Sequence, residues 1–380
     1  MNVLLIATTL NWLGPARLPR ALASAGFTVS LLAPGNSLAG KSRYVARNEP
    51  LPDGANRMQW TVAFAEAVQN AAPRLVVPCD DVATELLQAL ALEPPPALPS
   101  ATALRLATLA RDSLGDPRYY RTSIDKTLLA PAATALGVRV PRFEVVATVA
   151  AAGAFAAAHG YPVVLKRAHG VAGQAVEIVA DGTELARTFA RLNVILPHFS
   201  GEDRLRILIQ EFIPGRSLSR ASVAWGGHEL AGICLERVTR NPPRVGPGST
   251  VRIYDEPAAR AFSAALGRGL GLQGFFGIDY LVHERTGDAY MLEINRRVVP
   301  GTHLGATVGV DLCAALRAAI AGQPALTRND VPPGFERTVA QFPQEWLRDP
   351  ASPWLRTCPA DVPWDDPDVF EAMLSLRHLE

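Results

Sequence analysis

The sequence has few cysteines, little net charge and no fingerprint for dinucleotide binding, and each of these absences argues against a class of protein. Its 380 residues include only four cysteines, which are far apart and form no CxxC pair or Cys/His cluster. This spacing argues against a zinc site or a disulfide framework and fits a reducing compartment. The formal net charge of +1 gives no reason to expect nucleic acid or an anionic membrane as a partner.

The N-terminal stretch MNVLLIATTL is apolar but lacks the basic n-region and the cleavage site of a signal peptide. No apolar run in the sequence approaches the length that spans a bilayer. We therefore expect a cytoplasmic protein with no membrane partner. The turn at residues 8–14 lacks the GxGxxG fingerprint, which makes a dinucleotide-dependent dehydrogenase the weakest function considered.

Strands and helices alternate at the start of the chain, as in an open α/β sheet. Val3–Ala7 and Phe27–Leu32 are apolar runs typical of buried parallel strands, and Pro15–Gly26 between them has helical spacing. A stiff proline-rich segment at residues 93–99 follows several further elements. We expect the first domain to end at this segment.

Two acidic residues follow the strand predicted at Arg74–Val77. Ligands of such sheets bind beyond the carboxyl ends of the strands, so Asp80 and Asp81 can face a substrate there. The alternative, which we favour, is that Asp81 caps the helix predicted at Val82–Leu92.

A β-hairpin is predicted near residue 286. Ile278–Val282 and Ala289–Ile294 are strand-like, and Gly287 suits the left-handed position that closes a three-residue hairpin loop. Because side chains alternate along a strand, residues two apart on the second strand share a face. The hairpin therefore presents a set of polar side chains on one of its faces.

Those side chains are oxygen donors. A turn centred on Thr286 sets Asp279 opposite Glu293, and Asn295 projects from the same face as Glu293. Oxygen ligands on a rigid sheet suit Mg²⁺, which keeps some positions for substrate phosphates. The alternative is an ordinary solvated face, but asparagine is depleted in strands. Arg297 follows two residues later and can bind a phosphate or carboxylate with two hydrogen bonds.

Two lysines stand at the ends of predicted elements. Lys126 follows Asp125 at the start of a helix, and Lys166 ends an apolar strand. A lysine in that setting cannot be buried unpaired, and a phosphate is a natural partner. In the next loop, Gly170 and Gly173 allow backbone N–H groups to approach an anion closely.

These pieces, taken in order with the segment RILIQEFIPG at 206–215, resemble the ATP-grasp superfamily. Its members join a carboxylate to an amine, thiol or other nucleophile through an acyl-phosphate. The resemblance covers about residues 121–323. It implies an α/β protein with an N-terminal open α/β pre-ATP-grasp domain, a two-lobed ATP-grasp fold and a small C-terminal appendage.

The resemblance also implies three domain ranges. The pre-ATP-grasp domain is expected at residues 1–100 and the ATP-grasp domain at 101–325, with a nucleotide lobe at about 121–209 and a metal and substrate lobe at about 210–325. The appendage is expected at 326–380, where aromatic residues between prolines indicate packing on the main body or an oligomer contact, as in a homodimer.

The resemblance assigns ATP-binding residues along the first lobe and the segment that follows it. Gln210 would meet the exocyclic amine of adenine, and Ser217 stands where the family usually has an acidic ribose ligand. The set of expected ATP contacts is Lys126, Lys166, Gly170, Gly173, Gln174, Gln210, the backbone of Glu211 and Ile213, Phe212 nearby, and Ser217.

The implied metal ligands are Asp279, Glu293 and Asn295, which would hold two Mg²⁺ ions, or Mn²⁺, across the β- and γ-phosphates. Arg297 would steady the transferring phosphoryl group or the tetrahedral oxyanion. Arg237, with Arg240 and Arg244 nearby, would contact phosphate or a carboxylate substrate. The alternative for these three is a solvated basic loop.

The implied activity is that of an ATP- and Mg²⁺-dependent ligase. It activates a carboxylate as an acyl-phosphate and couples it to an amine, with release of ADP and phosphate. Its expected partners are therefore small-molecule carboxylates and amines. The alternatives are a carboxyphosphate- or carbamate-forming ATP-grasp enzyme and a non-catalytic ATP-binding regulatory protein. All three metal positions and both lysines are present, which disfavours the regulatory role.

Overall fold

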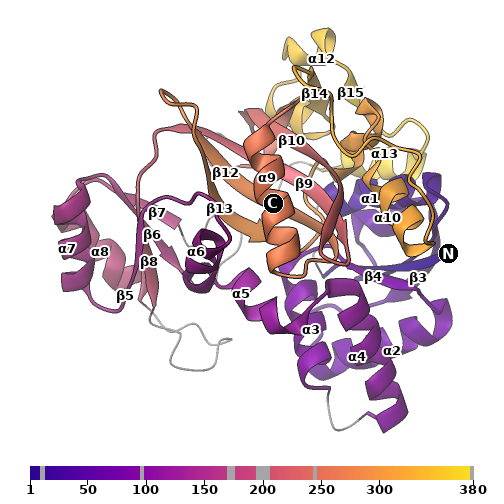
Figure 1. Cartoon of the computed structure of the whole chain (residues 1–380). Helices are drawn as coiled ribbons and strands as arrows, with labels where there is room; N and C mark the ends of the chain where they lie inside the picture. Colours follow the sequence, from indigo (N-terminus) through magenta and orange to yellow (C-terminus); the bar gives the residue numbers. More distant parts are fainter. Residues whose placement is uncertain (9–12, 95–97, 169–175, 194–205, 243–245, 377–380) are drawn as a thin grey trace. The chain divides into compact units, whose positions relative to one another are not determined.

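A computed structural model describes the chain except for residues 9–12, 95–97, 169–175, 194–205, 243–245 and 377–380 (Figure 1). The chain divides into two compact units. The first unit takes Met1–Pro117, Leu218–Ile278 and Asn295–Glu380, and the second takes Arg118–Ser217 and Asp279–Ile294. The sequence predicted three continuous domains, whereas these compact units are each discontinuous. The ranges 1–100, 101–325 and 326–380 remain a prediction.

The first unit contains a parallel four-stranded sheet of order β3-β2-β1-β4. Its strands are β1 (Asn2–Ile6), β2 (Thr28–Ala33), β3 (Val45–Pro50) and β4 (Leu75–Pro78). The helices that accompany it are α1 (Leu13–Ser24), η1 (Leu38–Lys41), α2 (Arg57–Ala71), α3 (Asp81–Leu92) and α4 (Ser100–Leu114). The open α/β domain expected from the sequence is therefore present. Strand β3 was not predicted, because its sequence VARNEP is polar and it lies at the edge of the sheet.

The same unit holds most of a seven-stranded sheet of order β13-β12-β9-β10-β11-β14-β15. Its strands before the C-terminal segment are β9 (Gly215–Trp225), β10 (His228–Arg240), β11 (Gly248–Tyr254), β12 (Gly274–His283) and β13 (Ala289–Asn295). The other elements here are α9 (Pro257–Gly269), η4 (Thr302–Val308) and α10 (Leu312–Ile320). One hydrophobic core joins both sheets and includes Leu5 of β1, Ile233 of β10 and Leu316 of α10.

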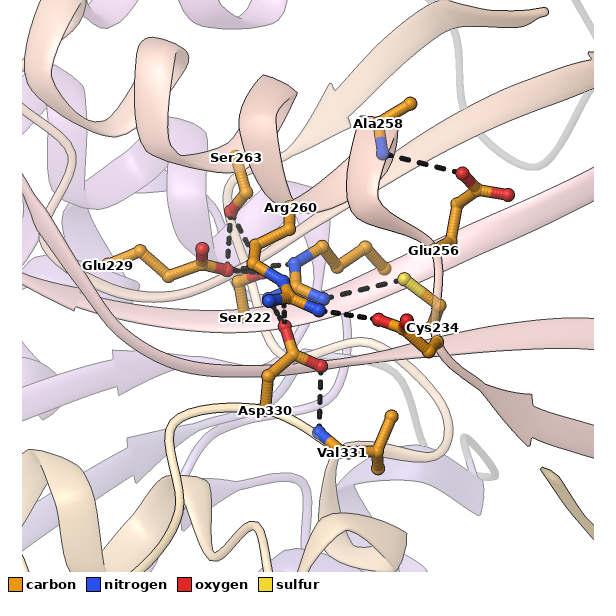
Figure 2. A network of polar contacts seen from close by, with 11 residues as sticks. Ser222, Glu229, Cys234, Glu256, Ala258, Arg260, Ser263, Asp330 and Val331 are labelled. Carbon is orange, nitrogen blue, oxygen red and sulfur yellow. Dashed lines mark hydrogen bonds and ion pairs between the residues drawn. The ribbon is translucent and has the colours of Figure 1, made fainter. Parts of the chain in front are cut away.

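A buried ion network fixes β9 and β10 in that core. The guanidinium of Arg220, whose residue is 1% exposed, donates to Glu229 at 2.9 Å and to Asp330 at 2.6 Å. Figure 2 shows Ser222 and Ser263 converging on Glu229, to which each donates a hydrogen bond. Because breaking a buried pair leaves an uncompensated charge, loss of one partner typically costs about 3–5 kcal/mol.

The C-terminal segment extends the first unit. Strand β14 pairs antiparallel with β11, and β15 pairs in parallel with β14. The elements of the segment are β14 (Glu336–Gln341), α11 (Gln344–Arg348), α12 (Trp354–Thr357), β15 (Ala360–Asp361) and α13 (Pro367–Leu374). Phe342, Val369 and Met373 pack with Leu13 and Leu38 in a separate core cluster. Of the two alternatives expected for this segment, packing on the main body is observed.

The second unit is built around an antiparallel sheet of order β5-β8-β6-β7. Its strands are β5 (Phe143–Val146), β6 (Val163–Arg167), β7 (Val176–Val179) and β8 (Ile207–Glu211). Its helices are η2 (Pro117–Tyr119, which begins in the first unit), α5 (Tyr120–Ile124), α6 (Lys126–Ala135), α7 (Val149–His159) and α8 (Gly182–Leu192). Helices α7 and α8 lie side by side (Figure 1), and Phe155 and Phe189 from them fill the core against the strands.

Within the described ranges, no single helix has the length and apolarity of a membrane span. The bent pair formed by Thr302–Val308 and Leu312–Ile320 reaches that length and apolarity only when its two members are joined.

Candidate active site

Two lysines meet in the second unit. Lys126 is the first residue of α6, whose N-terminus is capped by Asp125 through a hydrogen bond from the Thr127 N–H at 2.8 Å. The N–H of Lys126 donates to the carbonyl of Ala168 at 2.9 Å, just beyond the end of β6, which carries Lys166. This bond ties the start of the helix to the end of the strand and so brings the two ammonium groups close.

Two carboxylates from the hairpin accompany the lysines. Lys126 Nζ lies 3.3 Å from Glu293 Oε2. Burial lowers the pKa of Lys166, which is 5% exposed, from 10.5 to about 8. The charge of Glu293 opposes this change, that of Lys126 adds to it, and that of Asp279 opposes it. The second unit therefore contains a cluster of two ammonium groups and two carboxylates, and both lysines are buried.

The hairpin that supplies the carboxylates has the expected loop. Gly287 has a φ of 72°, its N–H donates to the His283 carbonyl at 3.0 Å, and the His283 N–H donates to the Asp288 carbonyl at 2.9 Å. Gly287 and Asp288 thus both face His283 as a bulge. Because of this bulge, residues at equal distances from Thr286 along the sequence need not lie opposite each other on the two strands. Both acidic side chains act on the charge of Lys166, so each lies near this lysine.

Arg297 and Asn295 belong to the first unit and contact each other. The Arg297 guanidinium, buried to 7% exposure, donates to Asp81 Oδ1 at 2.8 Å, to Asn295 Oδ1 at 3.2 Å and to the Val298 carbonyl at 3.4 Å. The carboxyl end of β4 thereby reaches the segment after β13. The pairing of Asp81 with Arg297 was missed from the sequence, where only the position of Asp81 after a strand pointed to a site.

The prediction that Asp81 caps the helix after β4 was wrong. The cap is Asp80, whose extended backbone (φ −147°, ψ 172°) lets its side chain accept the Ala83 N–H at 2.8 Å. Asp80 also accepts the Thr8 hydroxyl at 2.8 Å, which links the ends of β1 and β4. Asp81 is the first helical residue, so its side chain is available for the ion pair with Arg297.

The expected adenine-binding segment lies at the end of β8. Gln210 is 2% exposed and is in register with Phe143 of β5 and Val164 of β6. The Glu211 N–H donates to the Arg142 carbonyl at 3.0 Å, and its carboxylate accepts the Arg142 N–H at 2.8 Å. Beyond β8, the expected contacts differ in exposure: Ile213 is buried, Phe212 is exposed and Ser217 is half-buried in β9.

The structure describes only some of the other candidate residues. Arg237 and Arg240 are half-buried on β10. His303, which follows β13 and was not assigned a role from the sequence, forms a 2.7 Å contact with Asp361 of the C-terminal segment. Gly170, Gly173, Gln174 and Arg244 lie outside the described residues.

Comparison with known proteins agrees with this arrangement. Residues 124–301 match the ATP-grasp domain family, so the chain contains an ATP-grasp domain. The carbamoyl phosphate synthase large chain of Streptomyces avermitilis is 26% identical over 210 residues, which cover 52% of this chain and 18% of that protein. The chain thus matches less than a fifth of the length of this curated relative.

Solved structures share the fold over most of the chain. A biotin carboxylase–β-γ-ATP complex from Campylobacter jejuni has a TM-score of 0.64 at 16% identity, covering 85% of this chain and 71% of that one. N5-carboxyaminoimidazole synthetase from Staphylococcus aureus, complexed with ADP, has a TM-score of 0.62 at 11% identity, covering 89% of this chain and 81% of that one. At such identities the likeness establishes the fold alone.

Proposed function

We propose that this protein is an ATP- and Mg²⁺-dependent ligase that forms a C–N bond. It activates a carboxylate as an acyl-phosphate and couples the acyl group to an amine, with release of ADP and phosphate. The observation that carries the proposal is the cluster of Lys126, Lys166, Asp279 and Glu293 within the region that matches the ATP-grasp domain. Two ammonium groups beside two carboxylates suit a nucleoside triphosphate together with its metal ion.

The two lysines are the proposed phosphate ligands. The ammonium of Lys166 is poorly solvated, so phosphate oxygens would supply the favourable contacts that burial removes. Gly170, Gly173 and Gln174 are proposed to cover the phosphates. Adenine is proposed to lie against the end of β8, contacted by Gln210, the backbone of Glu211 and Ile213, and Phe212, with Ser217 toward the ribose.

The residues present fit a magnesium site that is completed by the nucleotide. Asp279 and Glu293 supply hard carboxylate oxygens, and Asn295 supplies an amide oxygen two residues further along β13. Among the described residues, no group of three or more His, Cys, Asp or Glu side chains stands ready to hold a metal. Because Mg²⁺ takes octahedral coordination, two carboxylates and an amide leave positions for phosphate oxygens. Bound Mg²⁺, or Mn²⁺, would neutralise charge on the β- and γ-phosphates.

The proposed reaction needs no protein nucleophile. The substrate carboxylate attacks the γ-phosphorus, the bond to the β-phosphate oxygen breaks, and ADP leaves. The amine then attacks the acyl carbon, loses a proton and expels inorganic phosphate. Arg297 is proposed to stabilise the developing negative charge and Arg237 to hold the anionic acyl group, so catalysis is by positioning and charge.

The second candidate is a ligase whose first substrate is bicarbonate, which would pass through carboxyphosphate or carbamate. The names of three relatives favour it: carbamoyl phosphate synthase, biotin carboxylase and N5-carboxyaminoimidazole synthetase. A 2-oxoglutarate carboxylase biotin carboxylase domain from Hydrogenobacter thermophilus, solved as a dimer with MgADP and bicarbonate, also has this fold, with a TM-score of 0.63. A non-catalytic ATP-binding regulator remains the third reading.

Two further properties are part of the proposal. The four free cysteines support a reducing compartment such as the cytoplasm. The dimer of the Hydrogenobacter domain makes a homodimer the assembly to test, with small molecules as the substrates.

The test is ADP release with ATP and Mg²⁺ against pools of carboxylic acids, amino acids and bicarbonate, with and without added amines. ADP that appears only with one acid–amine pair establishes the ligase and names its substrates. ADP released with bicarbonate, and increased by an amine, establishes the second candidate. ATP binding without turnover in any pool supports the regulatory role instead.

A further inference from the structure

Glu345, in helix α11 of the C-terminal segment, is a fully buried carboxylate to which the proposed reaction assigns no role. Its side chain is 0% exposed. Arg348 donates to both of its oxygens, at 2.9 Å from Nε and 2.5 Å from Nη2, and the Ser352 hydroxyl donates to it as well. Thr239 of β10 donates its hydroxyl to Oε2 at 2.9 Å. One carboxylate thus joins the C-terminal segment to the β10–β11 pair.

The carboxylate is held in its charged form. Burial on its own would raise the pKa of Glu345, but hydrogen bonds from Arg348, Ser352, Ser249 and Thr239 lower it to about 2. Charge-assisted hydrogen bonds are roughly twice as strong as neutral ones. Glu345 is therefore ionised at neutral pH and can accept all of these hydrogen bonds.

The anchor acts where the two strands lose their regular pairing. Arg237 is in register with Val251, Thr239 with Thr250, and Arg240 with Gly248, so the pairing shifts on both sides of Thr239. The hydroxyl of Thr239 also contacts that of Ser249 across the strands at 2.8 Å. Bulges of this kind re-aim side chains and occur often beside active sites.

The two arginines flank this irregularity. A Cβ on Gly248 would lie 3.4 Å from Cγ of Arg237, so the stem of Arg237 passes close over this glycine. Arg240 donates to the Gly246 carbonyl at 3.4 Å on the other side of Thr239. Thr239, held by Glu345, thus stands between the two candidate anion ligands of this pair of strands.

We propose that Glu345 is a positioning residue for the acid substrate: it fixes the irregular end of the β10–β11 pair and thereby holds Arg237 in place for an anionic group. The anionic group is a carboxylate or an acyl-phosphate, and this proposal rests on the proposed ligase function. It gives the C-terminal segment a part in substrate binding in addition to its part in packing.

The first test measures the anchor without any substrate. Hydrogen exchange followed by mass spectrometry is compared between wild type and Glu345→Gln, which keeps the size of the side chain and removes its charge. We expect amides of β10 and β11 near Thr239 and Ser249 to exchange about tenfold faster in the variant. The control is Asp366→Asn, which removes another buried carboxylate of the same segment, one that binds Ser42 and the Arg43 N–H.

The second test is kinetic. With the acid and amine found by ADP release, Glu345→Gln is expected to raise the KM of the acid about tenfold and to change the KM of ATP less than twofold, whereas Asp366→Asn changes neither. A purely structural role would lower the amount of folded enzyme without this split between the two KM values.

Two results overturn the inference: unchanged exchange at the β10–β11 pair in folded Glu345→Gln, or the same rise in KM with Asp366→Asn. If Glu345→Gln does not fold, Thr239→Val replaces it, because valine breaks the link to β10 and leaves Arg348 and Ser352 on Glu345. If wild type turns over no acid–amine pair, the proposed function fails, but the exchange result still decides whether Glu345 anchors the strands.

Discussion

Replacing Lys166 with methionine separates the stability of the protein from its affinity for ATP. Burial lowers the pKa of this lysine from 10.5 to about 8. The difference corresponds to about 3 kcal/mol by which the folded state disfavours the charged ammonium. Methionine has a similar length and no charge. We therefore expect Lys166→Met to raise the free energy of unfolding at pH 7 by as much as about 3 kcal/mol.

The sign of the pH dependence follows from proton binding. Between pH 8 and 10.5 the unfolded lysine binds more protons than the folded one, so wild-type stability rises with pH in that window. The advantage of methionine is expected to be complete below pH 8 and to disappear toward pH 10.5. Denaturant unfolding of both proteins at pH 7 and at pH 9.5 measures this difference.

ATP affinity is expected to change in the opposite direction. Without the ammonium, phosphate oxygens lose a charge-assisted hydrogen bond worth about 1.5–3 kcal/mol, which corresponds to at least a tenfold weaker Kd. In wild type, affinity should fall as the pH rises through about 8, and binding near that pH should take up a proton. Calorimetry in buffers of different ionisation enthalpy measures both quantities.

Lys126→Met is the matched control. Lys126 pairs with Glu293 at 3.3 Å, so its replacement removes this ion pair and should not stabilise the protein. The reasoning is refuted if Lys166→Met binds ATP as wild type does, or if it is less stable than wild type at pH 7.

Three further substitutions test the rest of the proposed site. Glu293→Gln should abolish turnover that depends on Mg²⁺ by removing a metal ligand, and wild-type turnover in this variant would show that the metal assignment is wrong. Arg297→Ala should lower kcat by 10²-fold or so and leave the Kd of ATP nearly unchanged, because the proposed role is stabilisation of developing charge; the reverse pattern would make Arg297 a nucleotide ligand. Asp81→Asn removes the 2.8 Å ion pair that holds Arg297, so we expect a smaller fall in kcat, about tenfold, with unchanged ATP affinity, and equal kcat would dismiss Asp81 as a support.

The elements that the sequence predicted well are those with local signals. The apolar runs of β1 and β4, and the turn at Gly287 with its positive φ, are present as expected because hydrophobic pattern and loop geometry are set by adjacent residues. The family to which residues 124–301 belong was also identified correctly, from motifs whose order carried more information than any one of them.

The features that were missed depend on contacts between distant parts of the chain. The choice between Asp80 and Asp81 as the helix cap was decided by backbone angles at one residue, which the sequence Asp-Asp does not distinguish. The use of Asp81 by Arg297, and of Thr239 by Glu345, joins residues far apart in sequence that no local pattern relates. The contact of the C-terminal segment with β10 was not predicted for the same reason.

The way the chain passes back and forth between its two units has a consequence for its synthesis. The second unit cannot be completed until residues 279–294 have been made, because these bring Asp279 and Glu293 to the lysines of residues 118–217. The large sheet of the first unit is completed later still, because its strands β14 and β15 lie near the end of the chain. No single continuous stretch of the chain therefore makes up a whole unit. A ribosome-bound chain must include Glu293 before the lysine–carboxylate cluster can assemble, and Ser352 before the Glu345 anchor is complete.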